Sequence, residues 1–145
     1  MPCNVFLSFE QEDIGTVRVF REHMDNEETD YIFYDYAAKA PFDSDGALDV
    51  RSDIEEILEK VAVTVVLIGR TTYADKWVDW EVRTSAARGK GLLGVMMHPG
   101  LGHIVPRALK DFKAEVLDLD IKDVTEAIER LARKAGGSEE DYETF

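Results

Sequence analysis

The sequence predicts an α/β domain in which a parallel sheet of about five strands carries helices on both faces. Two observations lead to this prediction. Short apolar segments rich in β-branched residues alternate along the chain with segments of helical periodicity, as in a parallel sheet with crossover helices. Residues 61–68 are almost all β-branched, which is typical of a central strand buried on both faces. A length of 145 residues provides one hydrophobic core, so a single domain is expected.

The first half of the chain supplies two strands, one helix and a long loop. Residues 4–9 form an apolar run that ends at an acidic turn, which indicates a buried strand. Apolar residues recur at helical spacing in residues 16–24 and predict an amphipathic helix. Residues 31–36 are aromatic and β-branched, which favours a second strand. Residues 37–49 have no periodicity and predict a loop, long enough to be typical of functional segments.

The central elements follow in the same alternation. Asp49 or Ser52 is suited to cap a helix that leads into the central strand, residues 61–68. Helical spacing returns over residues 74–88 and ends at a glycine. Residues 91–97 then predict a fourth strand, which a Pro-Gly pair terminates.

The last third of the chain predicts a short strand and one clear helix. The strand covers residues 114–119, and the helix covers residues 121–135, with a pair of glycines as its end. We therefore expect a single domain over residues 1–136 and a flexible acidic tail over residues 137–145.

Ligands of parallel α/β sheets bind beyond the carboxyl ends of the strands. In this chain that rule directs attention to four segments: residues 8–13, 35–49, 69–77 and 98–103.

The charge balance excludes several classes of partner. The net charge of −13 argues against a nucleic-acid-binding protein, and no apolar run approaches the ~20 residues of a membrane helix. Residues 61–110 hold seven basic and three acidic residues, so this segment is the one that attracts a small anion. Cys3 is the only cysteine, and the histidines lack a third ligand, so we expect no metal site. Since no secretory signal begins the sequence, we expect a cytoplasmic protein.

The sequence contains none of three common phosphate-binding or phospho-acceptor sites in its proper structural context. Residues 89–94 match the pattern G-x-G-x-x-G, but this segment leaves a helix and opens a strand, the reverse of a dinucleotide-binding turn. A phospho-acceptor receiver needs an aspartate after the third strand, where this chain has residues 69–72, Gly-Arg-Thr-Thr. The turn after the first strand, residues 10–13, is acidic and disfavours a phosphate loop.

One carboxylate stands out on a helical wheel of residues 76–87. Glu81 lies inside the aromatic and aliphatic stripe of that helix, beside Trp77 and Ser85. A charge in such a place is costly unless it is paired, protonated or facing a cleft. Glu81 is therefore either a functional carboxylate or a buried partner of a nearby arginine or backbone amide.

The chain also resembles a known family. Residues 5–9 with the following acidic turn, residues 63–69 and the Trp-Val-Asp-Trp-Glu-Val segment at 77–82 are similar to TIR domains. The similarity continues through residues 88–95 and is greatest to the TIR-like proteins of the Thoeris anti-phage defence system. The resemblance covers roughly residues 4–100 and implies a flavodoxin-like, three-layer TIR fold.

The resemblance also implies an activity, namely cleavage of NAD to nicotinamide and an ADP-ribose derivative, including cyclic isomers that signal to a downstream effector. NAD is then the substrate, and no cofactor is implied. In the family the glutamate matching Glu81 is catalytic. Phe9 matches an aromatic residue at the mouth of the nucleotide cleft, and Asp35 matches an aspartate that ends the second strand. The resemblance further implies self-association through the 37–49 loop.

Arg70 is assigned to the site from its own charge and position rather than from the resemblance. It follows the third strand, at the carboxyl edge of the sheet, where its positive charge is expected to bind the pyrophosphate of NAD. The predicted catalytic residue is thus Glu81, and the predicted substrate-binding residues are Ser8, Phe9, Asp35, Arg70 and Trp77. The alternative is a TIR-like interaction module without catalysis. The acidic residues 10–13 favour that alternative, because they repel an anionic dinucleotide.

Overall fold

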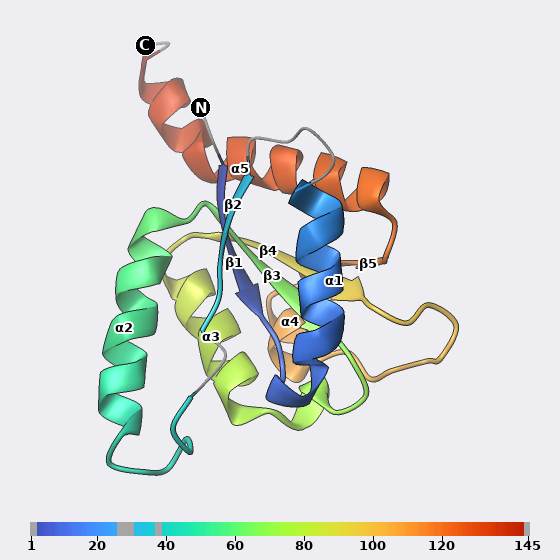
Figure 1. Ribbon diagram of the computed structural model, residues 1–145. Helices are drawn as coiled ribbons and strands as arrows, with labels where there is room; N and C mark the ends of the chain where they lie inside the picture. Colours follow the sequence, from blue (N-terminus) through green and yellow to red (C-terminus); the bar gives the residue numbers. More distant parts are fainter. Residues whose placement is uncertain (1–2, 26–30, 37–38, 144–145) are drawn as a thin grey trace.

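Five parallel strands form one sheet in the order β2-β1-β3-β4-β5 (Figure 1). The structure is a computed structural model that describes residues 3–25, 31–36 and 39–143. The strands are β1 (Cys3–Ser8), β2 (Tyr31–Tyr34), β3 (Val63–Ile68), β4 (Gly91–Met96) and β5 (Glu115–Asp118). This order, with β1 between β2 and β3, is the flavodoxin-like arrangement and confirms the predicted fold class.

Helices cover both faces of the sheet, which makes three layers (Figure 1). On one face, α1 (Ile14–Asp25) and α5 (Ile121–Glu143) pack against the strands. On the other face lie α2 (Ala47–Lys60), α3 (Lys76–Ala87) and α4 (Arg107–Asp111). Within the described residues, no helix has the length and apolar character needed to cross a membrane.

The alternation of side chains along the strands assigns them to the two layers. Val5 and Leu7 of β1 belong to the core beneath α1 and α5, whereas Phe6 belongs to the core beneath α2 and α3. Ser8, two residues beyond Phe6, therefore points toward α3 as well. All six residues of β3 are buried, as its apolar sequence predicted.

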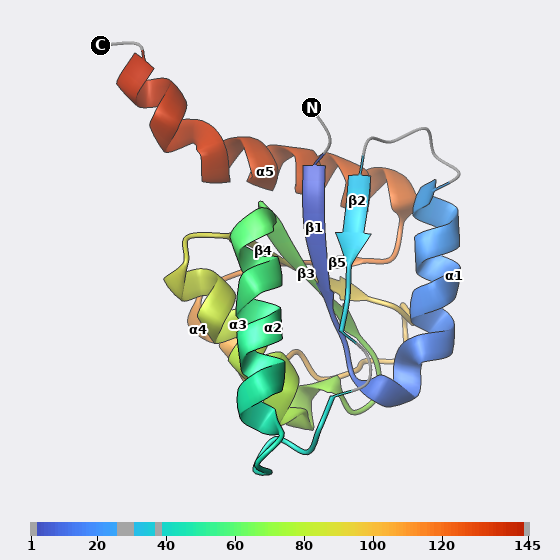
Figure 2. The same ribbon diagram turned by 60° about the vertical axis from the view of Figure 1, so that its left-hand side comes forward.

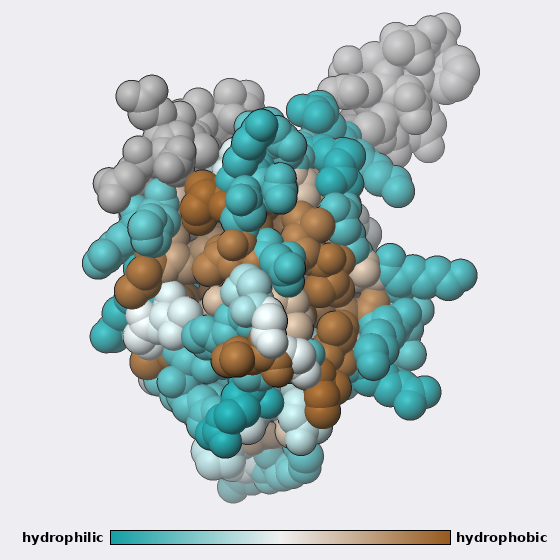
Figure 3. Space-filling view, turned by 90° about the vertical axis from the view of Figure 1, so that its right-hand side faces the viewer, coloured by the Kyte–Doolittle hydropathy of each residue, from teal (hydrophilic) through white to brown (hydrophobic). Residues whose placement is uncertain are grey.

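The carboxyl ends of the parallel strands lie at one edge of the sheet. In Figure 2, β1 and β2 begin near α5 and run away from it toward this edge. Two short 3-10 helices follow strands at this edge: η1 (Gln11–Asp13) after β1 and η2 (Thr72–Ala74) after β3. On the face shown in Figure 3, hydrophilic side chains surround scattered apolar ones, as is normal for a protein surface.

Several predicted boundaries differ from the structure. Helix α2 begins at Ala47 rather than after Asp49 or Ser52, so the predicted loop is shorter. Helix α4 was not predicted, since five residues are too few to show a period. Helix α5 continues through the two glycines to Glu143, because each glycine weakens a helix without forbidding it. Residues 37–38 of the predicted loop and 144–145 of the predicted tail lie outside the described residues.

Candidate active site

Glu81 is fully buried on the inner face of α3. Asp75 caps this helix, since its side chain accepts hydrogen bonds from the backbone N–H groups of Trp77 and Val78 at 2.8 and 3.1 Å. The cap fixes the first turn, and the apolar stripe of α3 then turns Glu81 toward the sheet together with Val78 and Val82. The helical wheel of residues 76–87 therefore predicted the orientation of Glu81 correctly.

The sheet contributes a hydroxyl to this carboxylate. The Oγ of Ser8, at the end of β1, donates a hydrogen bond of 2.6 Å to Oε1 of Glu81. One turn further along α3, Ser85 Oγ lies 2.8 Å from Thr64 Oγ1 of β3, which ties the helix to the strand. Ser85 Oγ also donates to the backbone carbonyl of Glu81 at 2.7 Å. These contacts hold the Glu81 backbone and one carboxylate oxygen in place.

The second carboxylate oxygen faces a lysine. Nζ of Lys39, from the segment between β2 and α2, lies 3.3 Å from Oε2 of Glu81, and the Lys39 side chain is only 9% exposed. Oε2 has no hydrogen-bond donor in good geometry among the described residues. The same ammonium lies 5.7 Å from the centre of the Phe9 ring, within the range of a cation–π contact. Glu81 and Phe9 thus form a small site that holds a cation.

Burial controls the protonation of Glu81. Loss of hydration raises the pKa of its carboxyl group from 4.5 to about 7. The Lys39 charge and the Ser8 hydrogen bond both act in the opposite direction and lower this pKa. A cation beside Glu81 therefore favours the ionised carboxylate, whereas removal of that cation favours the protonated form.

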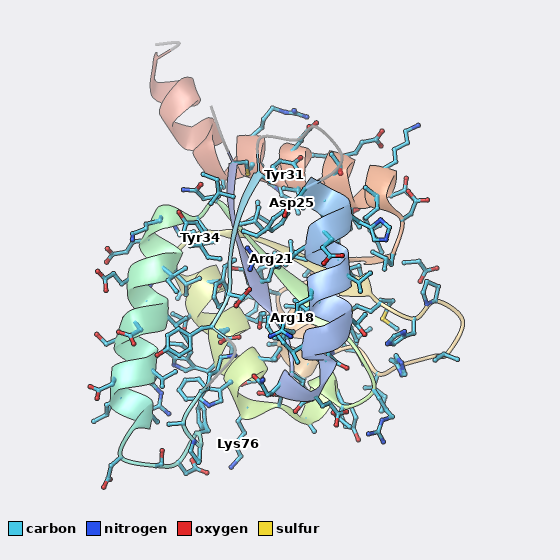
Figure 4. All side chains as sticks on the ribbon, in the orientation of Figure 1. Arg18, Arg21, Asp25, Tyr31, Tyr34 and Lys76 are labelled. Carbon is cyan, nitrogen blue, oxygen red and sulfur yellow. The ribbon has the colours of Figure 1, made fainter. Side chains whose placement is uncertain are left out.

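The segment that carries Lys39 is fastened to the surface of α2 and α3. The indole N–H of Trp77 donates to the carbonyl of Ala40 at 2.9 Å. Phe42 packs edge-on against Trp77, with ring centres 4.9 Å apart, and the guanidinium of Arg51 lies 4.5 Å from the centre of the Phe42 ring. Lys76, at the lower edge of Figure 4, binds Asp43 at 2.9 Å. We call residues 39–46 the strap, because these contacts hold them beside the buried carboxylate.

Of the predicted site residues, the structure brings Ser8, Phe9 and Glu81 together, the last two through Lys39. Trp77 is nearly buried, and its polar contact is with the strap. Asp35 forms an ion pair with Arg21, which extends from α1 toward β2 in Figure 4.

Arg70 lies at the predicted edge of the sheet, and its contact is with the acidic turn. Its side chain is 74% exposed, and its guanidinium lies 3.3 Å from Oε1 of Glu12. The Thr71 hydroxyl donates to the same oxygen at 3.0 Å. The Glu10 side chain accepts from the backbone N–H of Glu12 at 2.9 Å. Burial raises the pKa of Glu10 and of Asp13. The ion pair with Arg70 offsets the charge of Glu12, so the acidic turn repels an anion less than its sequence indicated.

Lys39 is the site residue that the sequence analysis missed. One signal could have found it, because Lys39 is the only basic residue in the otherwise acidic segment 37–49. Its segment follows a strand at the carboxyl edge of the sheet, so a cation there is well placed to meet a carboxylate at that edge.

Comparisons with known proteins give one family. Residues 6–100 match the family described as Thoeris protein ThsB, TIR-like domain. No curated protein of significant sequence similarity was found. Among solved structures, the chain is similar to the TIR domains in the structure of the activated Roq1 resistosome directly recognizing the pathogen effector XopQ. That match has 16% identity and a TM-score of 0.43, and it covers 93% of this chain and 84% of the other.

Proposed function

The chain belongs to the TIR-like family of the Thoeris protein ThsB, and on that premise we propose that it cleaves NAD between nicotinamide and ribose. The products of the proposed reaction are nicotinamide and an ADP-ribose derivative. The observation that supports this proposal most is the Glu81 carboxylate, fully buried and bonded to Ser8 at the carboxyl edge of the sheet. A buried carboxylate with a strongly raised pKa is characteristic of functional sites.

The chemistry of NAD cleavage suits a single carboxylate. The bond between ribose carbon 1 and the pyridinium nitrogen breaks, and its electron pair goes to the nitrogen. Nicotinamide thus leaves as a neutral molecule and needs no general acid. The ribose becomes a cation of oxocarbenium type, as in glycoside hydrolysis. Ionised Glu81 would stabilise this positive charge electrostatically, with Ser8 holding the carboxylate in position.

The fate of the ribose cation depends on the nucleophile that reaches it. Attack by water, with loss of a proton, gives ADP-ribose, whereas attack by a group of the same nucleotide gives a cyclic isomer. Exclusion of water favours the cyclic product. The buried position of Glu81 favours such exclusion. A cyclic product would be suited to signal to a separate effector.

The contacts of Lys39 indicate how the proposed substrate binds. The nicotinamide ring of NAD is a flat cation, and Phe9 and Glu81 offer an aromatic face and a negative charge. The Lys39 ammonium meets both of these groups in the structure, so it occupies the place that suits the cationic ring. We therefore propose that the strap closes the site and must move before NAD binds. Self-association through the 37–49 loop would provide such a movement.

The test is release of nicotinamide from NAD by the intact chain and by Glu81→Gln. Glutamine keeps the shape of the side chain and removes its charge, so we expect activity to fall by at least a hundredfold while the protein stays folded. The matched control is Glu126→Gln, an exposed position on α5, which should keep full activity. Wild-type turnover by a folded Glu81→Gln variant would contradict the assignment of Glu81.

A second candidate function is a TIR-like interaction module without catalysis. The observation that favours it is the ion pair between Lys39 and Glu81, which balances the charge of the carboxylate without any ligand. Nicotinamide release at high protein concentration distinguishes the two candidates. An interaction module releases none, even when Lys39 is replaced by methionine.

A further inference from the structure

A hollow lies on the opposite edge of the sheet from Glu81, at the amino ends of β4 and β5. Its volume is about 560 Å³, and the α3–β4 turn, the α4–β5 turn and α5 line it. In Figure 2 the strands begin beneath α5, whereas the carboxyl edge with the candidate active site lies at the other end of the strands. The residues that matter for its chemistry are Lys90, Phe112, Lys113, Glu115, Arg130 and Lys134.

This hollow is positively charged on a strongly acidic protein. Four of its lining residues are basic and one is acidic, although the whole chain has a net charge of −13. Arg130 binds the one acidic residue, Glu115, through two hydrogen bonds of 2.8 and 3.1 Å. Lys90, Lys113 and Lys134 make no ion pair with any side chain that the structure describes. Three lysines that line one hollow without an ion-pair partner among the described side chains favour an anionic ligand.

The backbone conformation of Lys113 is a second, independent indication that this lysine has a role at the hollow. Helix α4 ends in a Schellman motif, in which Lys113 N–H donates to Lys110 and Ala114 N–H donates to Leu109, at 3.0 and 2.9 Å. Lys113 occupies the left-handed position of this motif, with a φ of 53°. Glycine is the usual residue there, and α3 does end with one, Gly89, with a φ of 73°. The chain thus places a lysine on the rim of the hollow at a position where glycine is conformationally favoured.

The glycine-rich segment 89–94, which is no dinucleotide-binding turn, has a role in this arrangement. A Cβ atom at Gly91 would lie 3.0 Å from Cβ of Leu131, so glycine allows α5 to approach the start of β4. This close approach brings Lys90 near the α5 residues Arg130 and Lys134, which line the same hollow. The motif therefore helps to build the positive hollow.

The lining also offers an apolar surface. The Phe112 ring, 46% exposed, lies beside the lysines, and the side chains of Leu92 and Leu131 add further apolar lining. A volume of about 560 Å³ falls within the range of small-molecule sites. We propose that this hollow binds a nucleoside phosphate, with the phosphates on the lysines and the base against Phe112. This proposal does not depend on NAD cleavage.

The test uses ADP as the probe and isothermal titration calorimetry as the measurement. We expect ADP to bind, adenosine to bind at least tenfold more weakly, and ADP affinity to decrease with added salt. Lys113→Gly removes a cation and relaxes the backbone, so the affinity for ADP should fall about tenfold while Tm stays equal or rises. A merely structural lysine would not produce this opposite movement of affinity and stability.

Two further variants sharpen the result. Lys113→Arg keeps the charge and should keep ADP binding, and Lys122→Gln removes an exposed charge of α5 outside the hollow and should have no effect. The proposal is wrong if ADP does not bind at millimolar concentration, or if Lys113→Gly binds ADP as the wild type does. Equal losses in Lys113→Gly and Lys122→Gln would also contradict it, because they would show a general charge effect.

Discussion

Replacing Glu81 with glutamine should change how the stability of the protein depends on pH. The folded protein raises the pKa of Glu81 from 4.5 to about 7 by burying it. Between these two pH values, the folded state keeps a proton that the unfolded state has already lost. The wild type therefore loses stability as pH rises through this range, and the loss is complete above about pH 7. Glutamine does not titrate, so the variant lacks this term.

The size of the effect follows from the shift. A change of pKa from 4.5 to about 7 corresponds to about 3 kcal/mol of unfolding free energy. For a domain of this size that is roughly 10 °C in Tm. The pKa of about 7 already includes the attraction of Lys39, so the loss of this ion pair in the variant needs no separate term. Between pH 4.5 and pH 8, the free energy of unfolding of the variant should therefore rise by about 3 kcal/mol relative to that of the wild type.

The assay is urea unfolding of both proteins at pH 4.5, 6, 7 and 8, with Glu126→Gln as the control at an exposed position. The control should follow the wild type at every pH. If the free energy of unfolding of Glu81→Gln also varies with pH as that of the wild type does, Glu81 does not change its protonation on folding in this range. The argument from burial is then refuted.

The other predictions concern NAD cleavage, measured as nicotinamide release. Lys39→Met should raise the activity of dilute protein severalfold, because no ammonium group then competes with the cationic nicotinamide ring for Glu81. Lower activity at every protein concentration and pH would show instead that Lys39 assists the reaction. Arg70→Ala should raise KM severalfold and leave kcat nearly unchanged, because it removes an attractive charge and leaves the charge of Glu12 unbalanced. An unchanged KM would place the pyrophosphate elsewhere. Specific activity of the wild type should rise with protein concentration as the 37–49 loops meet, whereas a flat dilution series would contradict activation by assembly.

The strands and the larger helices could be predicted because their patterns are local. The seven apolar residues and one threonine of positions 61–68 indicated a buried central strand, and the stripe on α3 indicated which side of that helix faces the sheet. The ends of helices were less predictable. The two glycines near residue 136 resemble a helix end, yet α5 continues through them, because one or two glycines cost only about 1 kcal/mol each.

The burial of Glu81 could be predicted for the same reason, whereas its partners could not. Lys39 reaches Glu81 only because the strap takes a particular path, and that path depends on the contacts of Trp77 and Phe42. Contacts between residues distant in sequence also occupy Asp35 and Arg70, which pair with Arg21 and Glu12. No periodicity reports such pairings, because each one depends on two segments brought together by the fold.

The ion pair of Lys39 and Glu81 links opening of the strap to the charge of the carboxylate. The Lys39 ammonium lowers the pKa of Glu81, so replacing Lys39 with methionine, which is also apolar enough to keep the carboxyl group from water, raises that pKa further and favours the protonated form. A cationic substrate must then displace this proton when it binds. In Lys39→Met, the KM for NAD should therefore increase as pH falls below 7, approaching a tenfold increase per pH unit. A KM of this variant that stays constant between pH 5.5 and 7.5 would show that the substrate does not bind against Glu81.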